Sequence, residues 1–221
     1  MFPVKDTTLE RAFAPVTTLL ILATIALYIA DLRLSGGLQA ISRVSPLDAR
    51  NSLVLGSPGL VRLHASIILS GFMHTGVLHL ALNLVFLSAF APAVERTFGW
   101  VSFSVFFIAA IVCAFYTHAI VNPHLAAPVV GSSGAVAAVM GAYLVLRPTG
   151  RILTLIPLLP SMDVVEVPSL IFILVWLALQ ILPAALTPHA TSHVAWFTHI
   201  GGFLFGLVAG VNLRISGRAK R

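Results

Sequence analysis

Long uncharged segments alternate with short clusters of charged residues along the chain. These segments cover residues 12–30, 63–94, 97–146 and 167–213. A helix needs roughly 20 apolar residues to cross a bilayer, so the first two segments can hold one helix each. Turn-forming residues interrupt the third segment at residues 121–124 and the fourth around residues 182–193, so each of these can hold two helices. The pattern predicts an all-α polytopic membrane protein with six transmembrane helices.

The predicted organisation has one membrane domain and two short ends. We expect a cytoplasmic segment at residues 1–11, the six helices within residues 12–213 and a basic cytoplasmic tail at residues 214–221. The longest connection, residues 32–62, joins the first two helices on the outer side. Residues 12–30 lack a basic stretch at the very start of the chain and a small-residue cleavage site after them. We therefore interpret them as a helix and not as a signal peptide.

The composition agrees with a bilayer environment. Of the 221 residues, 58% are hydrophobic and 9% are charged, whereas about a quarter of the residues in soluble domains are charged. The formal charge of +6 would indicate nucleic acid in a soluble protein, but here it follows the topology bias of membrane proteins. With the N-terminus in the cytoplasm, nine Lys and Arg residues fall on the inner side and four on the outer side. We expect both ends to be cytoplasmic, with lipid and not nucleic acid as the surroundings.

Six strongly polar residues lie inside or at the ends of these apolar helices, where polar groups are costly and by default mark function. They are His74, His79, Asn83, Ser132, Ser133 and His199. Each of the helices that hold them ends at an arginine on the inner side. Four of the polar residues lie 13 to 17 residues before the arginine of their own helix: Ser133, His199, His79 and Asn83. At about 1.5 Å per residue, these four groups share one level roughly 20–25 Å above the inner interface. Three helices thus bring a hydroxyl, two imidazoles and an amide to one plane.

Small residues allow these helices to pack closely at that level. In the sixth helix, three glycines continue the helix face that begins at His199: Gly202, Gly206 and Gly210. The fourth helix has its own small residues between Gly134 and Ala142. Because such faces let two backbones approach closely, we expect His199 to reach the Ser133 hydroxyl.

A serine hydroxyl within reach of a neutral histidine is an activated nucleophile, and the histidine serves as general base and then as general acid. The side chains of His79 and Asn83, one helical turn apart, can stabilise an oxyanion, together with backbone N–H groups at the start of the fourth helix. Glycines on both sides of the serine pair permit a close approach of substrate. No acid is available to orient the histidine, so the residues predict a Ser–His dyad.

Four motifs together resemble those of the rhomboid family of intramembrane serine proteases. They are HTGVLHLALN (74–83), ERTFG (95–99), GSSGA (131–135) and HIGGFLFG (199–206). The likeness covers nearly all six predicted helices, and the sequence is similar to the bacterial members of the family that have six spans. The resemblance implies a rhomboid-like bundle that hydrolyses transmembrane segments of single-span membrane proteins without cofactor or metal. The six-helix layout without soluble domains favours a bacterial inner membrane, with an organelle membrane as the alternative. The second and fifth helices are the candidates for the substrate gate.

Within these motifs the resemblance assigns a role to each polar residue. It implies Ser133 as the nucleophile, with Ser132 as its variable neighbour, and His199 as the general base. It also implies His79 and Asn83 as oxyanion donors. Four further positions have structural roles near the site: His74, Gly131, Gly134 and Gly202.

The sequence departs from the family pattern in two places. Ala137 stands where many members have an aromatic residue that stacks on the histidine. Ala65 and Ser66 stand where many have a Trp–Arg pair in the first outer loop. Neither departure removes a reacting group.

The sequence lacks the residues that other classes of membrane protein require. A metalloprotease would need a motif such as H-E-x-x-H, and an aspartyl intramembrane protease would need two aspartates inside helices. A transporter usually shows charged relays or repeated halves, which this sequence lacks. The alternative that stays open is a catalytically inactive, rhomboid-like membrane chaperone. Such proteins keep the fold but lose the Ser or the His, whereas this chain has both.

Overall fold

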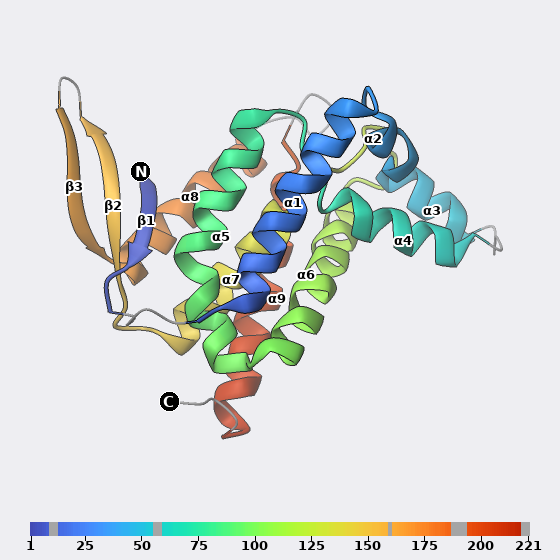
Figure 1. The fold of residues 1–221 in the computed structure, drawn as a ribbon. Helices are drawn as coiled ribbons and strands as arrows, with labels where there is room; N and C mark the ends of the chain where they lie inside the picture. Colours follow the sequence, from blue (N-terminus) through green and yellow to red (C-terminus); the bar gives the residue numbers. More distant parts are fainter. Residues whose placement is uncertain (9–12, 55–58, 159–160, 187–193, 218–221) are drawn as a thin grey trace.

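A bundle of long apolar helices makes up most of the molecule (Figure 1). The computed structural model describes residues 1–8, 13–54, 59–158, 161–186 and 194–217. The bundle helices are α1 (Pro15–Arg33), α5 (Val77–Phe98), α6 (Trp100–Val121), α7 (Ser133–Leu146), α8 (Ser169–Leu186) and α9 (Trp196–Ile215). Five of them are long and apolar enough to cross a membrane, and α7 is a shorter apolar helix of 14 residues. The prediction of a mostly helical, multi-pass membrane protein is confirmed.

Helix α7 forms the centre of the bundle. Every residue from Gly134 to Tyr143 is buried, as expected for a helix that is hydrophobic on all sides. Helix α9 packs against it through glycines, since a Cβ atom on Gly202 would meet the carbonyl oxygen of Gly134. A Cβ atom on Gly206 would likewise meet the carbonyl oxygen of Ala138. The two backbones are therefore in direct contact.

Three shorter helices connect α1 to α5 at one end of the bundle (Figure 1). They are α2 (Gly37–Ser42), α3 (Pro46–Val54) and α4 (Leu60–Ser70). Helix α4 has one buried face, formed by Leu63, Ile67 and Ser70. This is the long connection between the first two helices, together with the apolar lead-in to the second.

A three-stranded antiparallel sheet accompanies the helices, although the sequence pattern predicts helices alone. Its strands are β1 (Phe2–Asp6), β2 (Arg151–Leu158) and β3 (Ser161–Pro168), in the order β1-β2-β3. The sheet stands beside α5 and α8 (Figure 1). Phe2 pairs with Leu155, so the first residues of the chain pair with a segment beyond α7. The Tyr143 hydroxyl donates a hydrogen bond of 2.7 Å to Asp6, which joins β1 to the buried α7.

The start of α1 is fixed by a carboxylate from the far end of α5. Glu95 is buried, and its two oxygens accept hydrogen bonds from the amides of Val16 and Thr17, at 2.9 and 2.7 Å. The Thr17 hydroxyl adds a third bond of 2.7 Å. Pro15 at the first turn has no N–H of its own to satisfy. The predicted basic tail begins at the end of α9, and its residues 218–221 lie outside the described residues.

Candidate active site

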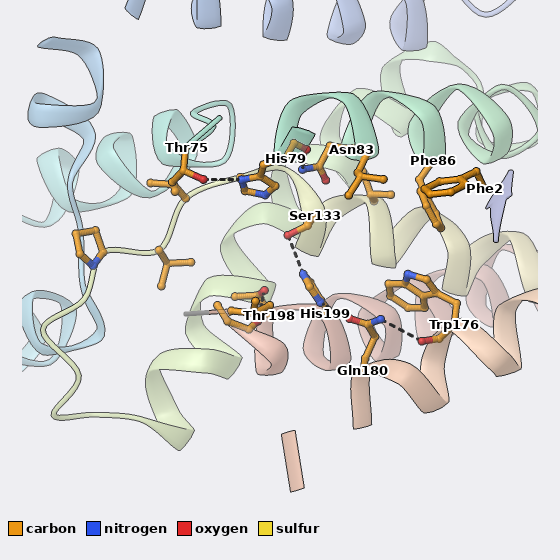
Figure 2. A pocket seen from close by; sticks show the side chains of 18 of the residues that line it. Phe2, Thr75, His79, Asn83, Phe86, Ser133, Trp176, Gln180, Thr198 and His199 are labelled. Atoms are coloured by element: carbon orange, nitrogen blue, oxygen red, sulfur yellow. Dashed lines mark hydrogen bonds between the residues drawn. The ribbon is translucent and has the colours of Figure 1, made fainter. Parts of the chain in front are cut away.

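Ser133 and His199 meet where α7 and α9 begin. Ser133 is the first residue of α7, and His199 lies in the first turn of α9. The Ser133 Oγ atom lies 2.9 Å from His199 Nε2 (Figure 2). The glycine contacts between the two helices allow this approach, because they leave no side chains between the backbones. The pair has the distance that a nucleophile and its general base require.

A third side chain, Gln180 of α8, contacts the other nitrogen of the imidazole. Its Oε1 atom lies 2.7 Å from His199 Nδ1, and its Nε2 atom donates a hydrogen bond of 3.1 Å to the carbonyl oxygen of Trp176. The rings of Trp176 and Trp196 flank the imidazole, each with its centroid 6.1 Å away. Aromatic packing around His199 therefore comes from α8 and α9, whereas Ala137 of α7 is fully buried.

The backbone before α7 turns sharply at Gly131. Its φ angle is +111°, a conformation that side chains disfavour. Its amide donates a hydrogen bond of 2.9 Å to the carbonyl oxygen of Ser70, at the end of α4. Ser132 is the N-cap residue of α7 and makes no side-chain cap hydrogen bond. The first amides of any helix have no intrahelical acceptor. In α7 the Ser132 side chain does not cap them either, and they lie beside the Ser133 side chain.

His79 and Asn83 come from the first two turns of α5 and line the same cavity as Ser133 (Figure 2). The Thr75 hydroxyl lies 3.3 Å from His79 Nδ1. Asn83 is buried, and its amide nitrogen donates a hydrogen bond of 3.0 Å to the His79 carbonyl oxygen. That bond takes one of the two amide hydrogens of Asn83, which leaves one to donate elsewhere.

His74 lies beside His79 but does not line the cavity. It precedes α5 and is buried. Its Nδ1 atom lies 3.2 Å from the carbonyl oxygen of Phe72. Its ring packs edge-on against His79, with 4.9 Å between the ring centroids. Burial and the neighbouring His79 lower the pKa of His74 to about 4, despite the Phe72 carbonyl. At neutral pH it is an uncharged packing residue.

The cavity itself is mostly apolar and has a volume of about 550 Å³. Its polar lining consists of Ser133, His199, His79, Asn83, Gln180, Thr75 and Thr198. An aromatic wall is formed by Phe2 of β1, Phe86 of α5 and Trp176 of α8 (Figure 2). No Asp or Glu is found among the described residues that line it. Such a cavity suits an apolar chain with a reactive group held next to Ser133.

Several of these residues were not expected from the sequence, among them Gln180, Trp176 and Phe2. Gln180 could have been found, since it is the only amide in α8 and a strongly polar residue in such a helix marks function. Phe2 reaches the cavity only because β1 pairs with β2, and no local pattern indicates that pairing.

A comparison with known protein families finds a match over most of the chain. The Rhomboid domain family model matches residues 62–216, which include nearly all of α4 and the whole of α5 to α9. No curated protein matches the chain.

Proposed function

The chain belongs to the rhomboid family, and we propose that it is an intramembrane serine endopeptidase with a Ser–His dyad. Its substrates are single-span membrane proteins, cut in or near the transmembrane segment. The observation that supports this most directly is the distance of 2.9 Å between Ser133 Oγ and His199 Nε2, at the wall of an apolar cavity.

In the first half of the proposed reaction, Ser133 Oγ attacks the scissile carbonyl carbon and its proton passes to His199 Nε2. The tetrahedral intermediate then collapses, and the imidazolium returns the proton to the leaving amine. This leaves an acyl-enzyme ester on Ser133. In the second half, a water molecule gives its proton to His199 and attacks the ester, which releases the new carboxyl end and restores Ser133.

The negative charge of each intermediate is stabilised by N–H groups around Ser133. The amides of the first α7 turn point out of the helix, and the helix dipole favours an anion there. His79 and the free amide hydrogen of Asn83 are the side-chain donors that we propose. Removal of one such donor typically lowers kcat by about 10²- to 10³-fold. We expect a loss of that size for Asn83→Ala.

The substrate must unwind before it can react, because amides within a helix keep their carbonyl oxygens hydrogen-bonded. Helix-weakening residues near the cut therefore favour cleavage. Small residues at the cut agree with the close approach of Gly131 to His79, where even a Cβ atom on the glycine would clash. The gate lies between α5 and α8 in this proposal, where β1 and the aromatic wall meet the cavity.

A fluorophosphonate probe tests the nucleophile directly, since it labels activated serines. We expect labelling of the wild-type protein and its loss in Ser133→Ala. Ser132→Ala is the matched control, because it makes the same Ser-to-Ala change at the neighbouring residue. It should leave labelling and cleavage intact. Labelling that survives Ser133→Ala would contradict the proposal. A wild-type protein that neither takes the probe nor cuts a transmembrane peptide would indicate the inactive, chaperone-like alternative.

The proposal includes a location and an orientation. We place the protein in a bacterial inner membrane, with the start of α1 and the end of α9 on the cytoplasmic side, residues 12–213 as the membrane domain and the α2–α4 connection outside. Residues 1–11 were expected in the cytoplasm, but Phe2 lines the cavity, so β1 extends from the cytoplasmic side toward the site. The excess of Lys and Arg in the segments assigned to the inner side supports this orientation.

A further inference from the structure

Gln180 is the only described side chain that hydrogen-bonds the Nδ1 side of His199. The distance between Gln180 Oε1 and His199 Nδ1 is 2.7 Å, and 8% of Gln180 is exposed. Because Gln180 is buried, its amide oxygen needs a hydrogen-bond partner within the protein. The imidazole is therefore its partner, and the contact is built into the packing of α8 against α9.

The orientation of the Gln180 amide is fixed by its own helix. Its nitrogen end lies 3.1 Å from the Trp176 carbonyl oxygen, one turn earlier in α8. The opposite orientation would place two oxygens against each other and lose this bond. Since an amide nitrogen donates and a carbonyl oxygen accepts, the Oε1 end must face His199.

This orientation selects one form of the histidine. An acceptor at 2.7 Å from Nδ1 requires that Nδ1 carries the hydrogen. In the neutral ring, Nε2 then has the free electron pair, and Nε2 is the atom that faces Ser133 Oγ. The other tautomer would place a hydrogen between His199 and Ser133, and His199 could not accept the serine proton.

We propose that Gln180 is a positioning residue, which holds His199 in the tautomer and ring orientation that can accept the proton of Ser133. It takes the place that a carboxylate has in a Ser–His–Asp triad. The inference rests on the proposed protease function and adds a third member to its site. The chain thereby orients the base without a buried negative charge, which is costly inside a membrane.

The test compares two variants of the full-length protein in detergent micelles. Gln180→Met keeps the length of the side chain but replaces the amide oxygen with a thioether, which is only a weak acceptor for Nδ1. Gln180→Glu keeps an acceptor and adds a charge. Leu179→Met, at the adjacent and exposed position of α8, is the control for substitution in this helix. A quenched-fluorescent transmembrane peptide with an Ala–Ala cut site is the substrate.

For Gln180→Met we expect kcat to fall by about 10²-fold, less than the roughly 10⁴-fold loss when a triad loses its orienting Asp. KM should stay within about two-fold, because the substrate contacts remain. For Gln180→Glu, the acidic limb of the kcat/KM profile should move to higher pH by about one unit, since a carboxylate stabilises the imidazolium. The other ionisable groups that act on His199 are His79 and His118, which both variants keep.

Two results would overturn the inference. One is a folded Gln180→Met protein with wild-type kcat. The other is a folded Gln180→Glu protein with the wild-type acidic limb, which keeps the idea testable if the Met variant does not fold. Both results presuppose a wild-type protein whose activity depends on Ser133. Absence of that activity would instead contradict the proposed function, so the two failures can be told apart.

Discussion

Gly131 is a single position where both the backbone and its surroundings exclude a side chain. Its φ angle is +111°, and a Cβ atom there would lie 2.7 Å from Cε1 and 2.8 Å from Nε2 of His79. For Gly131→Ala we predict displacement of His79 and a fall in kcat of about 10²-fold, as for a lost oxyanion donor. Peptide cleavage measures the effect.

Gly36→Ala is the control for the backbone part of this effect. Gly36 also has a positive φ angle, +81°, but nothing lies within 4 Å of its Cβ position. A similar loss of activity in both variants would contradict the role assigned to the contact with His79, since only backbone strain is common to them.

His74 makes the folded state sensitive to acid. Its pKa is about 4 in the fold, against about 6.5 in an unfolded chain. Between these values the unfolded chain binds more protons, so this contribution to stability is complete above pH 6.5 and is lost as the pH falls toward 4. We predict that the wild-type Tm falls over this window and that the Tm of His74→Gln falls less. The exposed His124→Gln should follow the wild type, and an equal slope in all three proteins would contradict the prediction.

The site residues that the sequence could predict are polar groups within apolar helices, where such groups are rare. Ser133, His199, His79 and Asn83 were placed at one depth by counting helical residues, and in the structure all four line one cavity. Gln180 does not stand out in the same way, because the usual partner of a catalytic histidine is a carboxylate. An amide oxygen accepts a hydrogen bond from Nδ1 as a carboxylate does, and α8 provides one at Gln180.

Among the elements, α1 depends on a cap that another helix provides. It is attached at its start by the three hydrogen bonds to Glu95. For Glu95→Ala we predict a loss of about 2–4 kcal/mol in unfolding free energy, because bonds to a charged acceptor are strong and buried donors are left unpaired. Thermal unfolding in detergent measures it. Arg96→Ala changes an exposed neighbour and should leave the Tm unchanged. Equal Tm values for both variants would show that the cap contributes nothing.

Helices and strands differed in how well the sequence predicted them. A transmembrane helix makes its backbone hydrogen bonds within one segment, and that segment can be recognised by its length and hydropathy. The bundle was therefore predicted. The strands could not be recognised in the same way. β2 and β3 contain or adjoin several prolines and lie in what reads as an inner loop, and β1 is five residues long. Their pairing joins Phe2 to Leu155, and no local pattern encodes such a distant contact.

At the scale of the whole molecule, the proposed orientation can be tested with introduced cysteines. Cys113 is the only cysteine and is first replaced by Ala. Ser35, after α1, and Ser216, after α9, are both exposed, and each is then changed to Cys. We expect a membrane-impermeant maleimide to label Ser35→Cys in intact cells and Ser216→Cys only after permeabilisation. The reverse result would mean that the bundle is inverted.

The pairing of β1 with β2 also has a consequence for how the protein is made. A ribosome completes β1 first, but the partner of Phe2, Leu155, is added only after α7. The strand must therefore wait, unpaired, while most of the bundle is synthesised and inserted. His199 comes later still, in the last helix. A chain that ends between α7 and β2 carries Ser133 but lacks both His199 and the strand that pairs with β1. In the proposed mechanism such an unfinished chain has no general base, so the order of synthesis delays proteolysis until α9 has been made.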